Sequence, residues 1–109
     1  MSAHLPHNHD AILRYLQTYH VGEAQAITSA NLQRLFNVTG ADIRETVRYY
    51  RQRGKQICSG SAGYWITHNT QAFLDNIDHL RRRATDMLET YNRAKDAALQ
   101  HHDGQISIA

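Results

Sequence analysis

Apolar residues recur three or four positions apart in three segments of the N-terminal half of this 109-residue chain. That spacing places them on one face of an amphipathic helix. A residue suited to an N-cap stands at or near the start of each segment, namely Asp10, Ser29 and Thr39. The pattern predicts three helices, the third ending at Gly54, where a glycine suits the left-handed C-cap. The apolar sets are Ile12, Leu13, Leu16 and Tyr19, then Leu32, Leu35 and Phe36, then Ile43, Val47 and Tyr50.

Two segments after the third helix alternate polar and apolar residues, as half-buried strands do. Residues 56–59 read Gln-Ile-Cys-Ser, and residues 64–67 read Tyr-Trp-Ile-Thr, with Gly-Ser-Ala-Gly between them. The composition of that link predicts a turn, and the whole segment a β-hairpin. We expect residues 26–28 to add a small third strand beside the hairpin.

A heptad pattern dominates the C-terminal third. Its apolar positions are separated alternately by four and three residues. We expect one helix, capped by Asn69 or Thr70 and running to about His101, which at ~1.5 Å per residue reaches ~45 Å. That length exceeds a small domain, so the distal half requires a partner, unless the helix packs back onto its own domain. The heptad positions are Phe73, Ile77, Leu80, Ala84, Met87, Tyr91, Ala94 and Ala98.

The order of these elements predicts an α+β fold, a winged helix-turn-helix extended by a long C-terminal helix. Residues 10–68 form the winged helix-turn-helix domain in this interpretation, and residues 69–102 form the long helix. Residues 1–9, with three histidines and a proline, are predicted to be a flexible leader, and residues 103–109 a flexible tail.

The distribution of charge supports nucleic-acid binding more than the net charge of +2 does. Residues 40–68 carry five Arg or Lys against two Asp or Glu, whereas residues 69–109 carry five against six. The positive excess therefore coincides with the third helix and the hairpin. The chain has no apolar run of the ~20 residues that a membrane helix needs. Cys58 is the single cysteine, so we expect a soluble cytoplasmic protein without an internal disulfide.

The face of the third helix opposite its apolar positions carries side chains that can read DNA. Arginine bonds to guanine O6 and N7, and glutamine pairs with adenine. The same arginines can clamp phosphates without reading sequence, and a basic face that only contacts water is the alternative. We expect DNA contacts from Arg44, Glu45, Thr46, Arg48, Tyr49, Arg51 and Gln52, with Thr39, Lys55 and Ser61 on phosphates.

Residues 32–66 resemble the N-terminal winged-helix domain of biotin-operon-repressor-type proteins. The resemblance rests on Arg51-Gln52-Arg53-Gly54 after an apolar helix–turn–helix, and on Ile57 and Gly63-Tyr64-Trp65-Ile66 in the hairpin. Gly-Tyr-Trp-Ile before a long arginine-bearing helix is also similar to small winged-helix proteins of phages and prophages. The resemblance implies double-stranded DNA binding in the bacterial host cytoplasm, by a transcription regulator or a replication accessory protein. The hairpin turn lacks Arg and Lys, however, and some winged helices bind only proteins.

The heptad stripe predicts a homodimer through the long helix, which would present two recognition helices to a palindromic site. Its alanines favour a helical bundle over a long coiled coil. The predicted contact residues are Ile77, Leu80, Ala84, Met87 and Tyr91.

The C-terminal residues 104–109 suggest a second kind of partner. Gln105-Ile106-Ser107-Ile108 resembles the peptides with which bacterial proteins bind the sliding clamp, although Ala109 stands where an aromatic residue is expected. The alternative function is therefore a protein-binding adaptor, which uses the scaffold, the long helix or the tail to recruit a replication or packaging partner.

The sequence shows no pattern typical of an enzyme. The histidines near the N-terminus have no cysteine or carboxylate cluster to complete a tetrahedral metal site. There is no glycine-rich phosphate loop with a lysine, and Cys58 is predicted to be a buried strand residue. We expect no catalysis, no metal and no cofactor.

Overall fold

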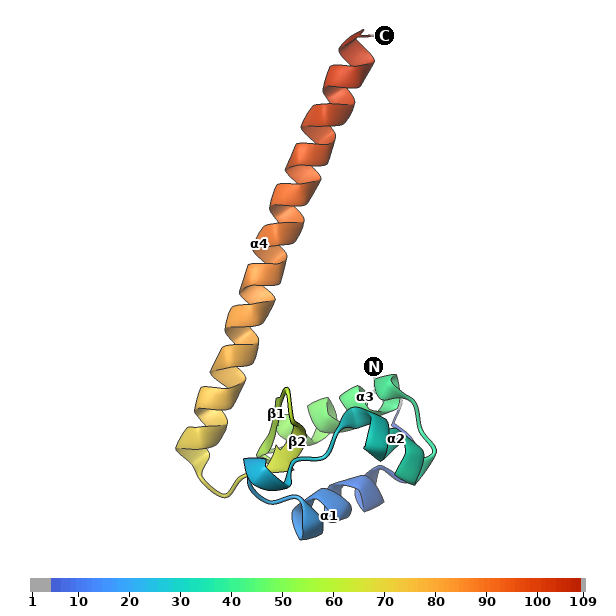
Figure 1. Cartoon of the computed structure of the whole chain (residues 1–109), viewed down its shortest axis with the longest axis vertical. Helices are drawn as coiled ribbons and strands as arrows, with labels where there is room; N and C mark the ends of the chain where they lie inside the picture. The colour runs from blue at the N-terminus through green and yellow to red at the C-terminus, as the bar shows by residue number, and fades with distance from the viewer. Residues whose placement is uncertain (1–4, 109) are drawn as a thin grey trace. The chain divides into compact units, whose positions relative to one another are not determined.

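The computed structural model describes residues 5–108, with side chains up to His101. Within this range it is an α+β structure of four α-helices, a 3-10 helix and an antiparallel hairpin (Figure 1). This arrangement is compatible with the predicted winged helix. The chain divides into two compact units, Met1–Asn76 and Ile77–Ala109. The elements are α1 (His9–Tyr19), η1 (Glu23–Gln25), α2 (Ser29–Phe36), α3 (Gly40–Arg51), β1 (Ile57–Gly60), β2 (Gly63–Ile66) and α4 (Thr70–Ile108).

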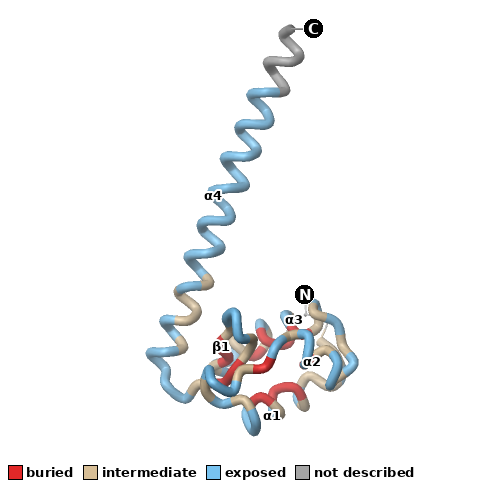
Figure 2. The backbone as a smooth tube through the Cα atoms, viewed as in Figure 1, coloured by how far each residue is buried: buried red, intermediate tan, exposed pale blue. Residues whose placement is uncertain are grey.

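The hydrophobic core of the first unit lies between α1, α2, α3 and the hairpin (Figure 2). The predicted inward faces of α1 and α3 are confirmed, except that Tyr19 is exposed. The prediction for α2 is wrong at Leu35, which is 57% exposed. This helix has only eight residues and meets the core through Leu32 and Phe36. The buried cluster is Ile12, Leu13, Leu16, Ile27, Leu32, Ile43, Val47, Tyr50, Ile57 and Ile66.

The first two helices begin earlier than their predicted caps imply, α1 by two residues and α2 by one. Asn8 is the N-cap of α1, and its side-chain amide donates to the Phe36 carbonyl at 3.0 Å. Thr28 caps α2, accepting from the Asn31 N–H at 3.2 Å, while Ser29 is the first helical residue. Asn8 is therefore tied to the end of α2 and does not belong to a flexible leader.

The predicted third strand is present as an isolated bridge between Ile27 and Tyr64. The Ile27 N–H donates to the Tyr64 carbonyl at 2.9 Å, and the Tyr64 N–H donates to the Ile27 carbonyl at 2.8 Å. Gly63 has φ +117°, and a Cβ there would clash with the Ile27 carbonyl. The bridge thus depends on glycine at this position. In the hairpin itself, Ile57 pairs with Ile66 and Ser59 with Tyr64.

The first turns of α4 are attached to the hairpin through side-chain amides. Asn69 caps the helix, as predicted, by accepting from the Ala72 N–H at 3.0 Å. The Asn76 side chain donates to the Ser59 carbonyl at 2.8 Å and accepts from the Ser59 N–H at 3.0 Å. These two bonds occupy backbone groups that the edge of β1 would otherwise leave open.

In the second unit, α4 continues as a helix to Ile108. The predicted flexible tail from residue 103 therefore differs from the structure, in which the backbone stays helical to Ile108. No proline interrupts the segment, and a single glycine, Gly104, costs a helix only about 1 kcal/mol. The side chains of the clamp-like segment at residues 104–109 lie outside the described part. None of the described helices combines the length and apolarity that crossing a membrane requires.

Candidate nucleic-acid interface

A capping box and three core residues hold α3 in place. The Thr39 hydroxyl accepts from the Asp42 N–H at 3.1 Å, and the Asp42 carboxylate accepts from the Thr39 N–H at 2.9 Å. This reciprocal pair satisfies two N–H groups at the start of the helix. On the inward side, Ile43, Val47 and Tyr50 are buried, as predicted. The opposite side of α3 is thereby fixed toward solvent.

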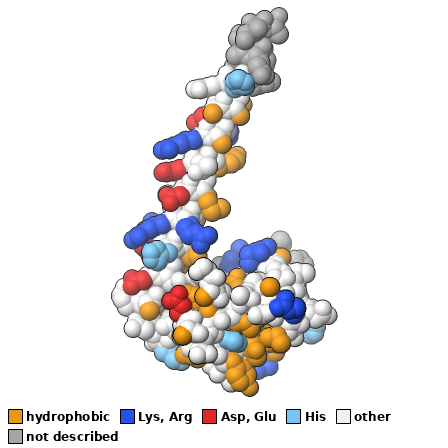
Figure 3. Space-filling view, viewed as in Figure 1, with side chains coloured by type: hydrophobic (Ala, Val, Ile, Leu, Met, Phe, Trp, Pro, Cys, Tyr) orange, Lys and Arg blue, Asp and Glu red, His pale blue; other side chains and the backbone are white. Residues whose placement is uncertain are grey.

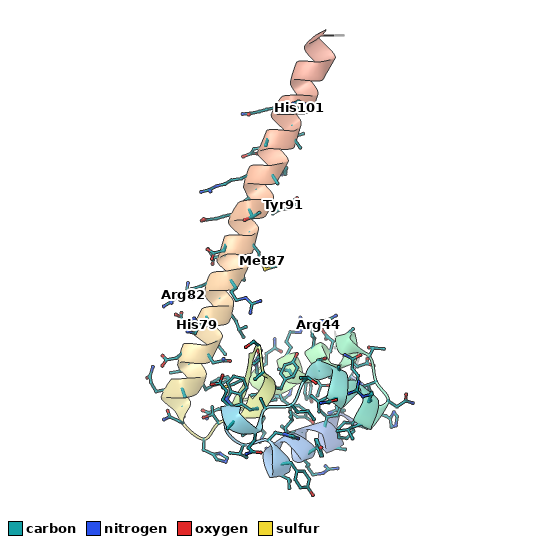
Figure 4. The ribbon with its side chains drawn as sticks, in the orientation of Figure 1. Arg44, His79, Arg82, Met87, Tyr91 and His101 are labelled. Carbon is teal, nitrogen blue, oxygen red and sulfur yellow. The ribbon has the colours of Figure 1, made fainter. Side chains whose placement is uncertain are left out.

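Arg44 and Arg48, one helical turn apart, form the exposed basic part of α3. Figure 4 shows Arg44 on the outer side of the helix. The side chain of Arg48 is 62% exposed and pairs with Glu45 at 2.6 Å. A pair so open to water contributes little stability, because solvent screens it. Arg48 is therefore free to exchange the carboxylate of Glu45 for another anion. We define the outer face of α3 as Arg44, Glu45 and Arg48.

Thr46 does not belong to this outer face, so its predicted DNA contact is wrong. It is only 1% exposed, and its hydroxyl donates to the Asp42 carbonyl at 2.8 Å. The spacing in the sequence already indicates that Thr46 is buried, because it lies three residues after Ile43 and four before Tyr50. A threonine at that position joins the buried stripe and satisfies its hydroxyl within the helix.

Arg51 is likewise directed into the molecule, which corrects its predicted place in the groove. Its Nε donates to the Ile57 carbonyl at 2.7 Å, and its Nη2 donates to the Ser59 hydroxyl at 3.0 Å. Burial lowers the pKa of the guanidinium, which still stays charged at neutral pH because arginine begins so high. Arg51 thus joins the end of α3 to β1.

Tyr49 is half-buried and packs against the core instead of extending freely from α3. The Arg53 guanidinium lies over its ring at 3.5 Å, and Arg53 Nη1 donates to the Tyr49 carbonyl at 3.0 Å. The ring of His9 meets Tyr49 edge-on at 5.7 Å between centroids. Arg53 and His9 are not among the predicted site residues. The four-residue spacing of Tyr49 and Arg53 is a sequence signal for their stacking.

The start of α1 also contacts α3, through the hydroxyl of Tyr50. This hydroxyl donates to the Asp10 carboxylate, and His9 Nδ1 lies 2.7 Å from it. Burial and the bond to Asp10 raise the pKa of Tyr50 to about 12. The same bond lowers the pKa of Asp10. His9 thus belongs to the folded unit and not to a leader.

The remaining predicted contacts lie at exposed positions around α3. Gln52 and Lys55 follow the end of the helix, and Ser61 is in the hairpin turn. Thr39 is exposed as well, although its hydroxyl already accepts the capping bond. In Figure 1 the hairpin turn and α3 lie toward one side of the first unit, and α1 lies toward the other. These four exposed polar residues thus lie at the start of α3, after its end and in the hairpin turn.

The predicted dimer contacts on α4 form a largely exposed apolar face. Ile77 and Leu80 are half-buried and Ala84 is exposed, while Met87 is 69% and Tyr91 60% exposed. Met87 and Tyr91 project from one side of α4, opposite His79 and Arg82 (Figure 4). In the view of Figure 3, hydrophobic side chains gather along one side of this helix and charged ones along the other.

Residues that could support metal binding or thiol chemistry are not assembled in the described part of the chain. No group of three or more His, Cys, Asp or Glu within that part could hold a metal ion. Cys58 is buried in β1, as predicted, and burial raises the pKa of its thiol. A buried thiol with a raised pKa is a poor nucleophile.

No protein-family model, no curated protein and no solved structure matches this chain.

Proposed function

We propose that this chain is a small double-stranded-DNA-binding protein of the winged-helix type, with α3 as its recognition helix. In this proposal Arg44 and Arg48 enter the major groove. Gln52 and Lys55 contact DNA beside them, and Thr39 and Ser61 contact phosphates. A phage or prophage regulator or replication accessory protein is the corresponding biological class, as the sequence resemblance implies.

The observation that carries the proposal is the exposed pair Arg44 and Arg48 on a helix that is held at its start, along its inward face and at its end. The capping box holds the start of α3, the core covers one face, and Arg51 ties its end to β1. A preorganised helix loses little conformational entropy on binding. Arginines one turn apart reach adjacent bases or phosphates, which is the arrangement that recognition helices use.

The outer face is also less basic than the sequence suggests, and this limits the expected affinity. Arg51 is used internally and Arg53 lies over Tyr49. Glu45 offsets part of the charge of Arg48. We therefore expect binding to random duplex DNA in the micromolar range, ~10⁻⁴–10⁻⁶ M, as is usual for non-specific contacts.

The test is fluorescence-anisotropy binding of the full chain to random-sequence duplex DNA across a salt series. Each phosphate contact contributes a slope of about −0.9 in log K against log salt. Arg44→Ala/Arg48→Ala is expected to weaken binding at least about tenfold, from a loss of about 1.5–3 kcal/mol per hydrogen bond to a charged phosphate. If both arginines contact phosphates, the salt slope also becomes shallower by about 2.

A matched control removes the same charge elsewhere. Arg14→Ala/Arg93→Ala deletes two exposed arginines, one on α1 and one on α4, and is expected to change affinity less than about threefold. Equal losses of DNA affinity in the two variants would show that only net charge matters. Such a result would reject α3 as the recognition helix. Absence of wild-type binding at low salt would reject the DNA proposal and favour the adaptor alternative.

Glu45→Gln sharpens the same test in the opposite direction. It removes the carboxylate that pairs with Arg48 and that would repel phosphate. Binding is expected to tighten by about two- to tenfold, the effect of about 0.4–1.4 kcal/mol. Unchanged affinity would place DNA away from the outer face.

A further inference from the structure

The apolar face of α4 repeats two large residues followed by one small residue. Between Ile77 and Ala94 its heptad positions are Ile77, Leu80, Ala84, Met87, Tyr91 and Ala94. Every residue from Arg81 to His101 is exposed. A face of this kind is covered when a second helix inserts large side chains opposite the small ones.

We propose that a second copy of this chain covers this face, with the two α4 helices antiparallel. One antiparallel register sets Ile77 of each copy against Ala94 of the other. The same register sets Ala84 against Met87, and Leu80 against Tyr91. Two of these three pairs join a large side chain to an alanine, and the third joins Leu80 to Tyr91, so no layer of this register consists of alanine alone.

A parallel pair of helices would not fit in this way, because each heptad residue would face its own copy. Ala84 would then face Ala84, and Ala94 would face Ala94, between layers of paired Met87 and paired Tyr91. Alanine layers between bulky ones leave voids, and voids in a packed interface are destabilising. The antiparallel copy is therefore the better occupant.

Charge supports the same orientation. Arg83 is next to the apolar face, and in the antiparallel register it lies near the level of Leu88 of the other copy. Asp86 of that copy is two residues, about 3 Å along the axis, from this level. No ion pair involves Arg83 or Asp86 in the described part of the single chain. Because the proposed dimer has two-fold symmetry, the pair between Arg83 and Asp86 forms twice.

A second opposite-charge pair follows from the same register. Lys95 lies near the level of residue 76 in the other copy, about 3 Å along the axis from Asp78. Asp78 already pairs with Arg81 and Arg82 of its own chain, so Lys95 would join an existing cluster. In a parallel dimer the residues flanking the seam pair as Arg83 with Leu88 and Thr90 with Lys95, without any opposite charges.

Disulfide trapping of the full chain tests the orientation. Two preparations of different mass, one Ile77→Cys and one Ala94→Cys, are oxidised separately and then as a mixture. The antiparallel register predicts a cross-linked species only in the mixture. Within one dimer of the Ala94→Cys variant the two introduced thiols would be about 25 Å apart along the axis. That separation is far beyond the ~7 Å that a disulfide spans between Cα atoms.

Several results would overturn the proposal. Efficient cross-linking of the Ala94→Cys variant with itself would show a parallel pair, and a monomer in sedimentation at every accessible concentration would show no pair. The wild type, with Cys58 buried, is the control for linkage that does not involve the introduced thiols. Unchanged Trp65 fluorescence in each variant shows that the first unit is still folded.

Charge reversal gives a second readout, which needs no cross-link. Asp86→Lys is expected to weaken dimerisation several-fold, and Arg83→Glu/Asp86→Lys to restore it, because the pair is rebuilt with its signs exchanged. A double variant as weak as the single one would contradict the antiparallel register. None of these measurements involves DNA, so the dimer and the DNA proposal fail separately.

Discussion

The two units of the chain share the same apolar spacing, but the apolar residues are buried in the first unit and largely exposed in the second. In α3 the residues at helical spacing are buried, with Ile43 fully covered, whereas Met87 in α4 is 69% exposed. Both patterns predict an amphipathic helix, but neither shows what lies against the apolar face. Helical periodicity thus identifies a face that requires a partner, and the surrounding elements decide whether that partner is internal.

The polar faces differ in a similar way. In α4, Arg81 and Arg82 each pair with Asp78 at 2.8 Å, within the helix itself. In α3, Arg51 instead reaches β1. A pair within one helix can be read from its spacing, but a bond to another element depends on the folded arrangement. Cations that appear equivalent in sequence therefore have different availability for DNA.

The largest difference between the units should appear in stability. Ile43→Ala is expected to lower the free energy of unfolding by about 2–5 kcal/mol, because it leaves a cavity in the core. Met87→Ala is expected to change it by less than about 0.5 kcal/mol. Urea unfolding followed by Trp65, the only tryptophan, measures the first unit. Equal effects of both variants would contradict the separation of a buried and an exposed apolar face.

The next largest effect is expected at the glycine beneath the Ile27 bridge. Gly63→Ala forces a positive φ on alanine and a clash with the Ile27 carbonyl, with a loss of about 1–3 kcal/mol from strain. Gly54→Ala is the control, because Gly54 has φ +85° but no atom within 4 Å of a Cβ, and about 1 kcal/mol is expected there. The same unfolding assay compares them, and a milder loss for Gly63→Ala would argue against the bridge.

Substitution of Arg51 is expected to lower the stability of the fold, whereas substitution of Arg48 is expected to weaken DNA binding. Arg51→Ala leaves the Ile57 carbonyl without its charged donor and should cost about 1–3 kcal/mol of folding free energy. Arg48→Ala should cost less than about 0.5 kcal/mol but weaken DNA binding. Unfolding and anisotropy measured on both variants give the comparison. Strong loss of DNA affinity in a fully folded Arg51→Ala protein would show that Arg51 contacts DNA directly.

The smallest effect concerns alkaline pH. The pKa of Tyr50 rises from 10.0 to about 12 in the folded protein, so the unfolded chain loses this proton first. Its contribution to stability is complete below pH 10 and declines as pH rises from 10 to 12. Tyr50→Phe should remove that part of the pH dependence in unfolding measurements. Parallel curves for wild type and variant would show that burial and the bond to Asp10 do not raise the pKa of Tyr50.

The helices and the hairpin are predictable because each has a local signal, such as the Thr39 cap. The predicted end of α3 at Gly54 is wrong, because the helix ends at Arg51 with Gln52 as its C-cap, and Gly54 has its positive φ two residues beyond that cap. The prediction for Thr46 is wrong even though its spacing from Ile43 marks it as buried, since a hydroxyl also suits a DNA contact. Arg51 cannot be placed from sequence, because its acceptors belong to a strand that follows a turn. The role of Asn76 is hidden for the same reason, as its amide bonds to Ser59.

The end of α4 illustrates the limit of composition as a guide. Residues 103–109 contain a glycine and small polar residues, which are typical of a tail, yet the backbone remains helical to Ile108. Once a helix is nucleated, each further residue adds one backbone hydrogen bond without a second nucleation cost. A heptad stripe likewise gives no orientation by itself. The order of large and small residues along it does.

The proposal that α3 binds DNA and α4 binds a second copy is tested most directly by amide NMR of the full chain titrated with duplex DNA. The proposed functions predict shift changes concentrated at Arg44, Arg48 and Ser61, with none specific to Met87 or Tyr91. Changes centred on Met87 and Tyr91, with the outer face of α3 unaffected, would contradict the assignment of DNA to α3.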